Sequence, residues 1–352
     1  MDKLIISSLI VLTAYLFNVI EKNGKKWELV FPIVILSLIS GLRGQTVGTD
    51  TYGYAFSIEN GFPYGYLFPE VGFRFMSSGL FYLTHNFSTV FLFFALLTNA
   101  LFFLRMWDFR ETSSFTYMSL FYLFSFYINS LNIMRQYAAV AMVFYGTRYL
   151  EKNKMWRFLA ILALAVLIHN TAILGLAFVF IYTWDSLTKR QKIAYLIPLA
   201  FLAVFAVKFM TAYAREHIDN YFHQYTDNVN ITYFYKLFVF VIIMALNYLR
   251  VDVIIQRKNR IKLQILRFRD VETLVYVMGL ALSSLGMFFL FMSRIGLYYL
   301  AFEPVFWGKA VKQGYSRQLA LALTLILVIY QFYHLIVLND CFVFPYYIHL
   351  GG

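Results

Sequence analysis

Long apolar segments recur along the whole chain, separated by short polar ones. They are continuous rather than alternating, which is typical of helices that cross a membrane and not of β-strands. Each main segment is long enough to cross a hydrocarbon core of ~30 Å. They cover residues 4–20, 27–42, 87–104, 114–131, 133–150, 157–183, 192–210, 232–250, 271–293, 295–311 and 318–338, with a shorter one at 71–84. We therefore predict an all-α, polytopic integral membrane protein with about 11–12 transmembrane helices, forming a single transmembrane domain over residues 1–352.

The composition agrees with this prediction. Of the 352 residues, 61% are hydrophobic and 14% are charged, whereas about a quarter of a soluble domain is charged. The net charge of +12 would also suit a nucleic-acid-binding protein. In a membrane protein, however, basic residues collect in cytoplasmic loops, so we expect no nucleic-acid partner. Cys341 is the one cysteine, which excludes an intramolecular disulfide and a multi-cysteine metal site.

The basic residues predict the orientation of the chain, because cytoplasmic loops carry an excess of Lys and Arg. Lys22, Lys25 and Lys26 follow the first apolar segment, so the N-terminus is expected outside. The most basic loop, 250–270, is expected in the cytoplasm. Residues 43–68 and 211–231 then form outer loops rich in aromatic side chains. These aromatics suit contacts with sugar rings, and an ordinary interfacial aromatic belt explains them equally well.

Two apolar segments do not fit simple alternation. A full crossing at 71–84 would place the basic loop 148–157 outside, so we predict a re-entrant or broken helix there. A single crossing at 157–183 would likewise place the basic residues after it outside. We predict instead a hairpin of two half-helices that turns at His169, each of about 12 residues or roughly 18 Å. A single tilted helix is the alternative. A polar hairpin tip requires protein or water around it, so His169 is expected in a cavity that opens outward.

Ionisable side chains within membrane segments are costly, which makes them candidates for function. Under this topology such residues approach the outer half of the membrane; they are Arg43, Asp50, Glu70, Arg74, Arg135, His169 and Arg294. Arginines outnumber carboxylates there, against the positive-inside trend, and this predicts an anionic ligand. A guanidinium fork suits a phosphate or a diphosphate. For each residue alone, a snorkelling arginine, a helix–helix hydrogen bond or a salt bridge at a helix end is the alternative.

An anion at the outer membrane face beside a potential base suits a glycosyltransferase that uses a lipid-diphosphate donor. Arginines can neutralise the charge of the leaving diphosphate without a metal. The sequence contains no DxD-like, HExxH or Cys/His cluster that would indicate a metal, and no glycine-rich phosphate loop. We therefore predict a metal-independent transfer with no cofactor.

Several stretches carry a recognisable set of motifs, namely GLRGQTVGTDTYGY, FPEVGFRF, NIMRQYAAVA, VLIHNTAILG and SRIGLYYL. Together they resemble the EpsG family of Wzy-type polysaccharide polymerases, from about residue 20 to residue 310. The positions that match the family's motifs are Arg43, Gly48, Asp50, Tyr52, Glu70, Arg135, Gln136, His169 and Arg294. One departure is Asn170, which precedes Thr171 where a small hydroxyl residue is expected directly after the histidine.

The resemblance implies an enzyme of the bacterial cytoplasmic (inner) membrane, with its active site facing outward among membrane lipids. Such an enzyme joins oligosaccharide repeat units that are linked to undecaprenyl diphosphate, with one lipid-linked unit as donor and another as acceptor. The product would be an O-antigen, a capsule or an exopolysaccharide. A chain-length regulator protein is the further partner that the resemblance implies.

Within this interpretation, Arg135 and Arg294 bind the donor diphosphate, helped by Arg43. His169 is the candidate general base because histidine titrates near neutral pH. Asp50 is the rival base and Glu70 a third catalytic candidate. The candidate substrate contacts are Tyr52, Gln136, Arg74, Arg215, His217 and Tyr298.

Three other classes of protein share parts of this pattern. A ligase that joins finished polymer to another lipid uses the same chemistry, usually with a longer outer loop than 211–231. A transporter or flippase of the lipid-linked unit should show internal repeats, which we do not find in the sequence. A structural subunit of an envelope complex would tolerate the loss of Arg135, Arg294 and His169.

Overall fold

The structure is a computed structural model that describes residues 2–64, 68–183, 241, 270–285 and 290–312, with scattered positions between 325 and 349. The described residues are mainly helical and form no named strand, which confirms the all-α prediction for this part of the chain. Their one isolated β-bridge pairs Arg43 with Ile348. Several predicted segments lie wholly or largely outside the described residues; they are 192–210, 211–231, 232–250, 250–270 and 318–338.

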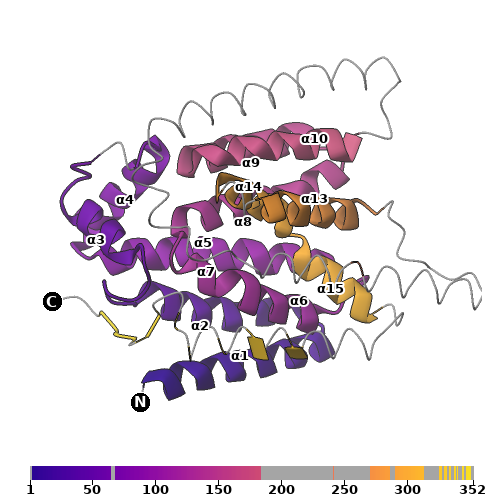
Figure 1. Ribbon diagram of the computed structural model, residues 1–352, viewed down its shortest axis with the longest axis horizontal. Coiled ribbons are helices and arrows are strands. Elements are labelled where there is room, and N and C mark those ends of the chain that lie inside the picture. Colours follow the sequence, from indigo (N-terminus) through magenta and orange to yellow (C-terminus); the bar gives the residue numbers. More distant parts are fainter. Residues whose placement is uncertain are drawn as a thin grey trace, which may run out of the picture.

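The long helices lie side by side as roughly parallel rods, with α1 and α2 at one edge and α9 and α10 at the other, while α3 and α4 are inclined to them at one end (Figure 1). The first half of the chain forms α1 (Asp2–Asn23), η1 (Lys26–Leu29), α2 (Val30–Gly41), α3 (Thr51–Glu59), α4 (Val71–Thr84), α5 (Phe87–Asp108), α6 (Phe115–Tyr122), η3 (Leu123–Tyr127) and α7 (Ile128–Ser130). The second half forms α8 (Met134–Glu151), α9 (Met155–Ile168), η4 (Asn170–Gly175), α10 (Leu176–Thr183), α13 (Val271–Leu285), α14 (Leu290–Leu300) and α15 (Glu303–Lys312).

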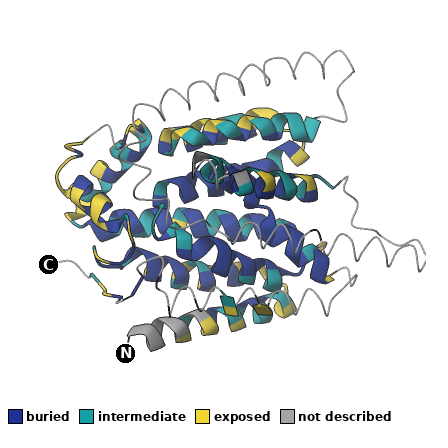
Figure 2. Ribbon diagram, viewed as in Figure 1, coloured by how far each residue is buried: buried dark blue, intermediate teal, exposed yellow. Residues whose placement is uncertain are grey.

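Helices α5 and α8 form the centre of the structure. Helix α5 packs against α2 and α8, and α8 packs against α9. Buried residues concentrate on these central helices, whereas exposed residues lie on the outer helices and on α3 and α4 (Figure 2). Among the described helices, α5 alone is long and apolar enough for a full membrane crossing. Its 22 residues span about 33 Å. The number of crossings for the whole chain stays a prediction.

The segment 71–84 is one unbroken helix, α4, rather than a broken one. It begins after Glu70 and ends at Thr84, and the next residue, His85, has a left-handed backbone with φ 51°. Its 14 residues reach roughly 21 Å, which is too short for a hydrocarbon core of ~30 Å. Exposed apolar side chains line the helix, including Phe75 and Tyr82. The length and the apolar surface agree with a partial entry into the membrane, which stays a prediction.

The segment 157–183 reverses direction at His169, as predicted. Helix α9 ends at Ile168, and His169 has an extended backbone with φ −153° and ψ 117°. Beyond the turn, η4 and α10 return along α8, because the Tyr182 hydroxyl donates to Glu151 Oε1 at 3.4 Å. Since Glu151 lies only a few residues before the start of α9, the two arms of the hairpin run in opposite directions. His169 therefore lies at the tip.

Helices α13 and α14 cross closely because small residues face each other. A Cβ atom at Gly279 would lie 2.6 Å from the backbone nitrogen of Leu300, and one at Gly296 would lie 2.1 Å from Ser283 Oγ. Such small-residue contacts allow membrane helices to pack backbone to backbone. Helix α14 also contacts α8 and η4. The close crossing thus positions α14 against the hairpin tip.

Substitution of Gly296 by valine should destabilise the protein by about 1–3 kcal/mol, because the added atoms overlap Ser283. Thermal unfolding of the detergent-solubilised protein measures the effect. Gly79→Val is the matched control, since nothing lies within 4 Å of a Cβ atom at Gly79. Equal unfolding temperatures for the two variants would contradict the close crossing.

Candidate active site

Arg135 lies in the first turn of α8, inside a shell of aromatic rings. Its guanidinium carbon lies 4.5 Å from the ring centre of Phe68, 5.3 Å from that of Phe73 and 5.7 Å from that of Tyr54. Arg135 Nη1 forms an ion pair with Glu70 Oε2 at 2.5 Å. Aromatic faces attract a cation, and a buried charge in such a place requires a partner. The ion pair and the aromatic rings therefore fix the position of the Arg135 side chain at this end of α8.

Glu70 joins three chain segments through one carboxylate. It precedes α4, and only 5% of its side chain is exposed. While Oε2 contacts Arg135, Oε1 accepts a hydrogen bond from the backbone nitrogen of Asn170 at 3.3 Å. Glu70 thereby holds the start of α4, the start of α8 and the hairpin tip together.

His169 is held from one side of its ring. Its Nδ1 lies 2.7 Å from Thr171 Oγ1, and Thr171 Oγ1 lies 3.0 Å from the Tyr298 hydroxyl of α14. Arg135 and Arg294 are the charged side chains that act electrostatically on the imidazole. The ion pair of Arg135 with Glu70 and the electrostatic effect of both arginines on His169 thus link these four predicted site residues.

Gln136 connects α8 to α14 beside this group. Its Nε2 donates to the backbone oxygen of Arg294 at 2.7 Å, and the residue is 2% exposed. The other amide atom, Oε1, is buried without a hydrogen-bond partner in the part of the chain that the structure describes. The contact fixes the backbone that carries the Arg294 side chain, and the orphan oxygen can accept a hydrogen bond from a ligand.

The arginines of this region outnumber their carboxylate partners. The half-buried Arg294 side chain forms no hydrogen bond or ion pair with the described residues. Arg74 lies one turn beyond Glu70 on α4, and its Nε is buried with no partner among the same residues. Glu70 compensates one charge, that of Arg135. The remaining positive charge suits an anion.

Arg43 lies in a different environment, since it is 1% exposed and contacts protein atoms throughout. Its Nη2 donates to the backbone oxygen of Leu131 at 2.9 Å, its Nη1 donates to that of Ser40, and its Nε contacts Thr51 Oγ1 at 3.3 Å. The guanidinium carbon lies 4.4 Å from the ring centre of Phe91. These contacts favour a structural role for Arg43 over a direct contact with diphosphate.

The loop after Arg43 packs against the residues that precede α8. Gly48 has φ +95°, and a Cβ atom there would lie 2.4 Å from Asn132 Oδ1. That same oxygen accepts a hydrogen bond from the backbone nitrogen of Thr49 at 2.9 Å. A glycine is required because both the positive φ and the close approach exclude a side chain. The loop thus stabilises the turn that precedes Arg135.

The structure does not join every predicted site residue to this group. Asp50 is half-buried and accepts a hydrogen bond from Thr49 Oγ1 at 3.0 Å. Tyr52 is 62% exposed and stacks on Phe56. No contact of either residue with His169 is present among the described residues. Arg215 and His217 lie outside the described residues.

Sequence reasoning missed the role of Thr171 and of the aromatic shell. Asn170 supplies a backbone N–H to Glu70, and the next residue, Thr171, supplies the hydroxyl that contacts the imidazole. The departure from the expected motif therefore leaves a hydroxyl in contact with the histidine. A polar residue at a predicted hairpin tip was the available signal.

The family model named EpsG family matches residues 26–348, which include every site residue described above. The chain belongs to the EpsG family. This family consists of polysaccharide-polymerase-type membrane proteins, and the match confirms the family that the sequence motifs indicated. No curated protein and no solved structure matches the chain.

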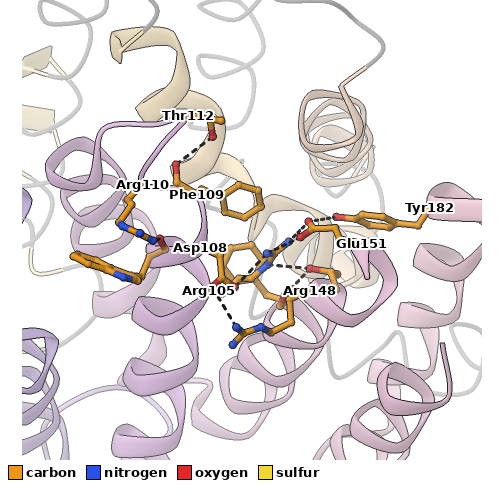
Figure 3. Close-up of polar contacts among 11 residues, drawn as sticks. Arg105, Asp108, Phe109, Arg110, Thr112, Arg148, Glu151 and Tyr182 are labelled. Atoms are coloured by element: carbon orange, nitrogen blue, oxygen red, sulfur yellow. Dashed lines mark hydrogen bonds and ion pairs between the residues drawn. The ribbon is translucent and has the colours of Figure 1, made fainter. Parts of the chain in front are cut away.

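A second charged cluster of this EpsG-family protein lies at the other end of α8 (Figure 3). Arg105 is fully buried, donates from Nη1 to Glu151 Oε2 at 3.0 Å, and donates from Nε to Thr147 Oγ1 at 3.2 Å. Arg148 pairs with Asp108 at 3.3 Å. Arg135 and Glu151 lie about 24 Å apart along α8, at about 1.5 Å per residue. The two ends of the helix thus carry separate polar groups.

The two environments predict different consequences for two arginines. Arg43→Lys should lower the thermal stability by about 2–4 kcal/mol, because lysine cannot satisfy the carbonyl and hydroxyl acceptors of the guanidinium. Arg294→Lys should leave the stability within about 0.5 kcal/mol, since its side chain has no described partner. Thermal unfolding of the two purified variants checks this contrast, and the reverse order would refute the structural role of Arg43.

Proposed function

We propose that this protein is a glycosyltransferase that polymerises oligosaccharide repeat units linked to undecaprenyl diphosphate. The reaction takes place at the outer face of the cytoplasmic membrane and needs no metal. The observation that carries the proposal is the meeting of Arg135, Arg294 and His169 at the hairpin tip, with Glu70 as the nearby carboxylate. The family supplies the coarser activity, polysaccharide polymerisation.

The charge of the group supports a diphosphate ligand. Arg135 is oriented by Glu70 and by aromatic rings before any ligand arrives, and Arg294 brings a charge that no described carboxylate neutralises. Guanidinium groups form paired hydrogen bonds with phosphate oxygens. Donors that are already in place stabilise the charge that develops on a leaving diphosphate, because little reorganisation is needed during the reaction.

The arrangement of polar groups along α8 supports the proposed side of the membrane. The cluster of Arg105 and Glu151 lies at the end of α8 where basic residues predict the cytoplasm. The hairpin tip lies at the opposite end, about 24 Å away. A polar tip inside a membrane protein requires a water-filled or protein-lined space, which would admit the lipid-linked sugar from outside.

The transfer breaks the bond between the anomeric carbon and the diphosphate oxygen. A new bond forms between that carbon and the acceptor hydroxyl. Both arginines act electrostatically on His169, which is therefore the catalytic residue that we place at the reacting groups. Both carboxylate oxygens of Glu70 are engaged with Arg135 and Asn170, so we assign this residue to positioning. Tyr298 also contacts the hairpin rather than open space, and we assign it the same role.

Replacement of Arg294 by alanine should reduce polymerisation about 10- to 100-fold, because one charge-assisted contact to the diphosphate is lost. A strain that lacks the gene is complemented at matched membrane levels, and the polymer ladder is resolved on a gel. Arg110→Ala is the control, because Arg110 is 41% exposed and pairs with the exposed Glu111. The control should restore the full ladder.

Polymerisation by the purified protein from a synthetic lipid-linked repeat unit separates the proposal from a transporter. A ladder in this assay requires an enzyme. Full ladders from both Arg294→Ala and Arg135→Ala would place the diphosphate elsewhere, and a product on a different acceptor lipid would favour a ligase.

A further inference from the structure

The hydroxyl groups of Tyr298 and Thr171 and the imidazole of His169 form one hydrogen-bonded row. The Tyr298 hydroxyl lies 3.0 Å from Thr171 Oγ1, which in turn lies 2.7 Å from His169 Nδ1. The row ends at Tyr298, which is 0% exposed. Each hydroxyl carries one proton and can donate once, so the direction of donation at one end sets the direction along the whole row.

The buried end decides that direction. Among the described residues, Thr171 is the hydrogen-bond partner of the Tyr298 hydroxyl. A buried donor that finds no acceptor costs about 1–3 kcal/mol. The Tyr298 hydroxyl therefore donates to Thr171 Oγ1, and Thr171 donates its own proton to Nδ1. Donation in the reverse direction would leave the Tyr298 proton buried with no acceptor in the described part of the chain.

This direction determines the tautomer of His169. An Nδ1 that accepts a hydrogen bond has no proton, so the neutral imidazole carries its proton on Nε2. Nε2 lies on the ring edge away from Thr171, and Arg135 and Arg294 are the charged groups that act on the ring. The site therefore presents N–H donors from three side chains, Arg135, Arg294 and His169. Such a set is suited to holding an anion, whereas a neutral imidazole protonated at Nε2 cannot take a proton at that atom.

We propose, on the basis of the proposed function, that His169 acts as a hydrogen-bond donor to the donor diphosphate through Nε2–H and not as the general base. Tyr298 and Thr171 are positioning residues that set the tautomer. In the transfer, the diphosphate leaves with the electrons of the broken C–O bond, and Nε2–H stabilises its new negative charge. The proton of the acceptor hydroxyl ends on the released diphosphate, so atoms and charge balance.

Three substitutions of His169 separate a donor from a base. Glutamine places an amide N–H₂ near the position of Nε2 and cannot act as a base, whereas asparagine reaches only the position of Nδ1. We expect His169→Gln to retain polymerisation within about tenfold of wild type. His169→Asn and His169→Ala should lose about 10²- to 10³-fold, as on removal of a donor to a developing anion. A glutamine variant as inactive as the alanine variant would overturn the proposal.

A double-mutant cycle tests the positioning role of Tyr298. Tyr298→Phe frees Thr171 to accept from Nδ1–H, so the wild-type background should lose about two- to fivefold in the rate of polymerisation, since the bias between tautomers disappears. The same substitution should have no effect in the His169→Gln background, because an amide does not change tautomer. An equal loss in both backgrounds would show a merely structural effect and refute the relay.

Tyr299→Phe is the matched control for this cycle. The adjacent Tyr299 hydroxyl donates to the backbone oxygen of Leu174 at 3.2 Å and does not contact His169. This variant should leave the rate unchanged in both backgrounds. Thr171→Ser keeps the hydroxyl and should retain activity, whereas Thr171→Val should behave as Tyr298→Phe does.

The dependence of the rate on pH gives an independent readout in membranes that contain the full-length protein. A donor stays protonated at Nε2 as the pH falls, so wild type and His169→Gln should share one profile shape. An acid limb present in wild type and missing in His169→Gln would identify a base. Full activity of both His169→Ala and Arg135→Ala would contradict the proposed function itself. Loss of activity in every His169 variant, glutamine included, would overturn only the role of His169 as a donor.

Discussion

The contacts of the Glu70 carboxylate are the constraint on which the rest of the site depends. One oxygen pairs with Arg135 and the other accepts the backbone N–H of Asn170, so α4, α8 and the hairpin tip meet at one residue. The pair lies among aromatic rings, where an unpaired charge would be strongly destabilising. The arginine thus keeps a defined position while the surrounding shell stays apolar, and the histidine of the hairpin is held beside it.

Charged side chains gather at the two ends of α8. The layer between them is mainly apolar and includes one neutral hydrogen-bonded group, formed by Asn99, Ser37 and Tyr122. At one end of α8 the buried Arg105 is satisfied by Glu151 and Thr147 and rests against the ring of Phe109. At the other end Glu70 compensates the charge of Arg135, and no carboxylate among the described residues pairs with Arg294. The first cluster needs no ligand, because its charges balance within the protein. The second has a surplus, which is why we place the chemistry there.

Much of this arrangement follows from sequence patterns. The excess of basic residues in particular loops predicted that the chain turns at His169, and the structure contains that hairpin. The apolar runs predicted an all-α fold, and the motifs indicated the family that the comparison shows. The contacts do not support the roles predicted for Arg43 and Asp50, which match motif positions in the same loop. Arg43 is fully occupied by protein acceptors, and Asp50 has no described contact with the histidine.

The sequence by itself determined the helical fold, the polar hairpin tip and the residue types of the site, because hydrophobic runs and charge asymmetry are local properties of the chain. The tertiary structure alone decided which arginines are satisfied by the protein and which are not. It also decided that Thr171 and Tyr298 form a row with His169. Such differences depend on contacts between residues far apart in the sequence, such as Arg43 with Leu131 or Thr171 with Tyr298. A side chain's partners follow from packing in three dimensions, which periodicity along one helix does not encode.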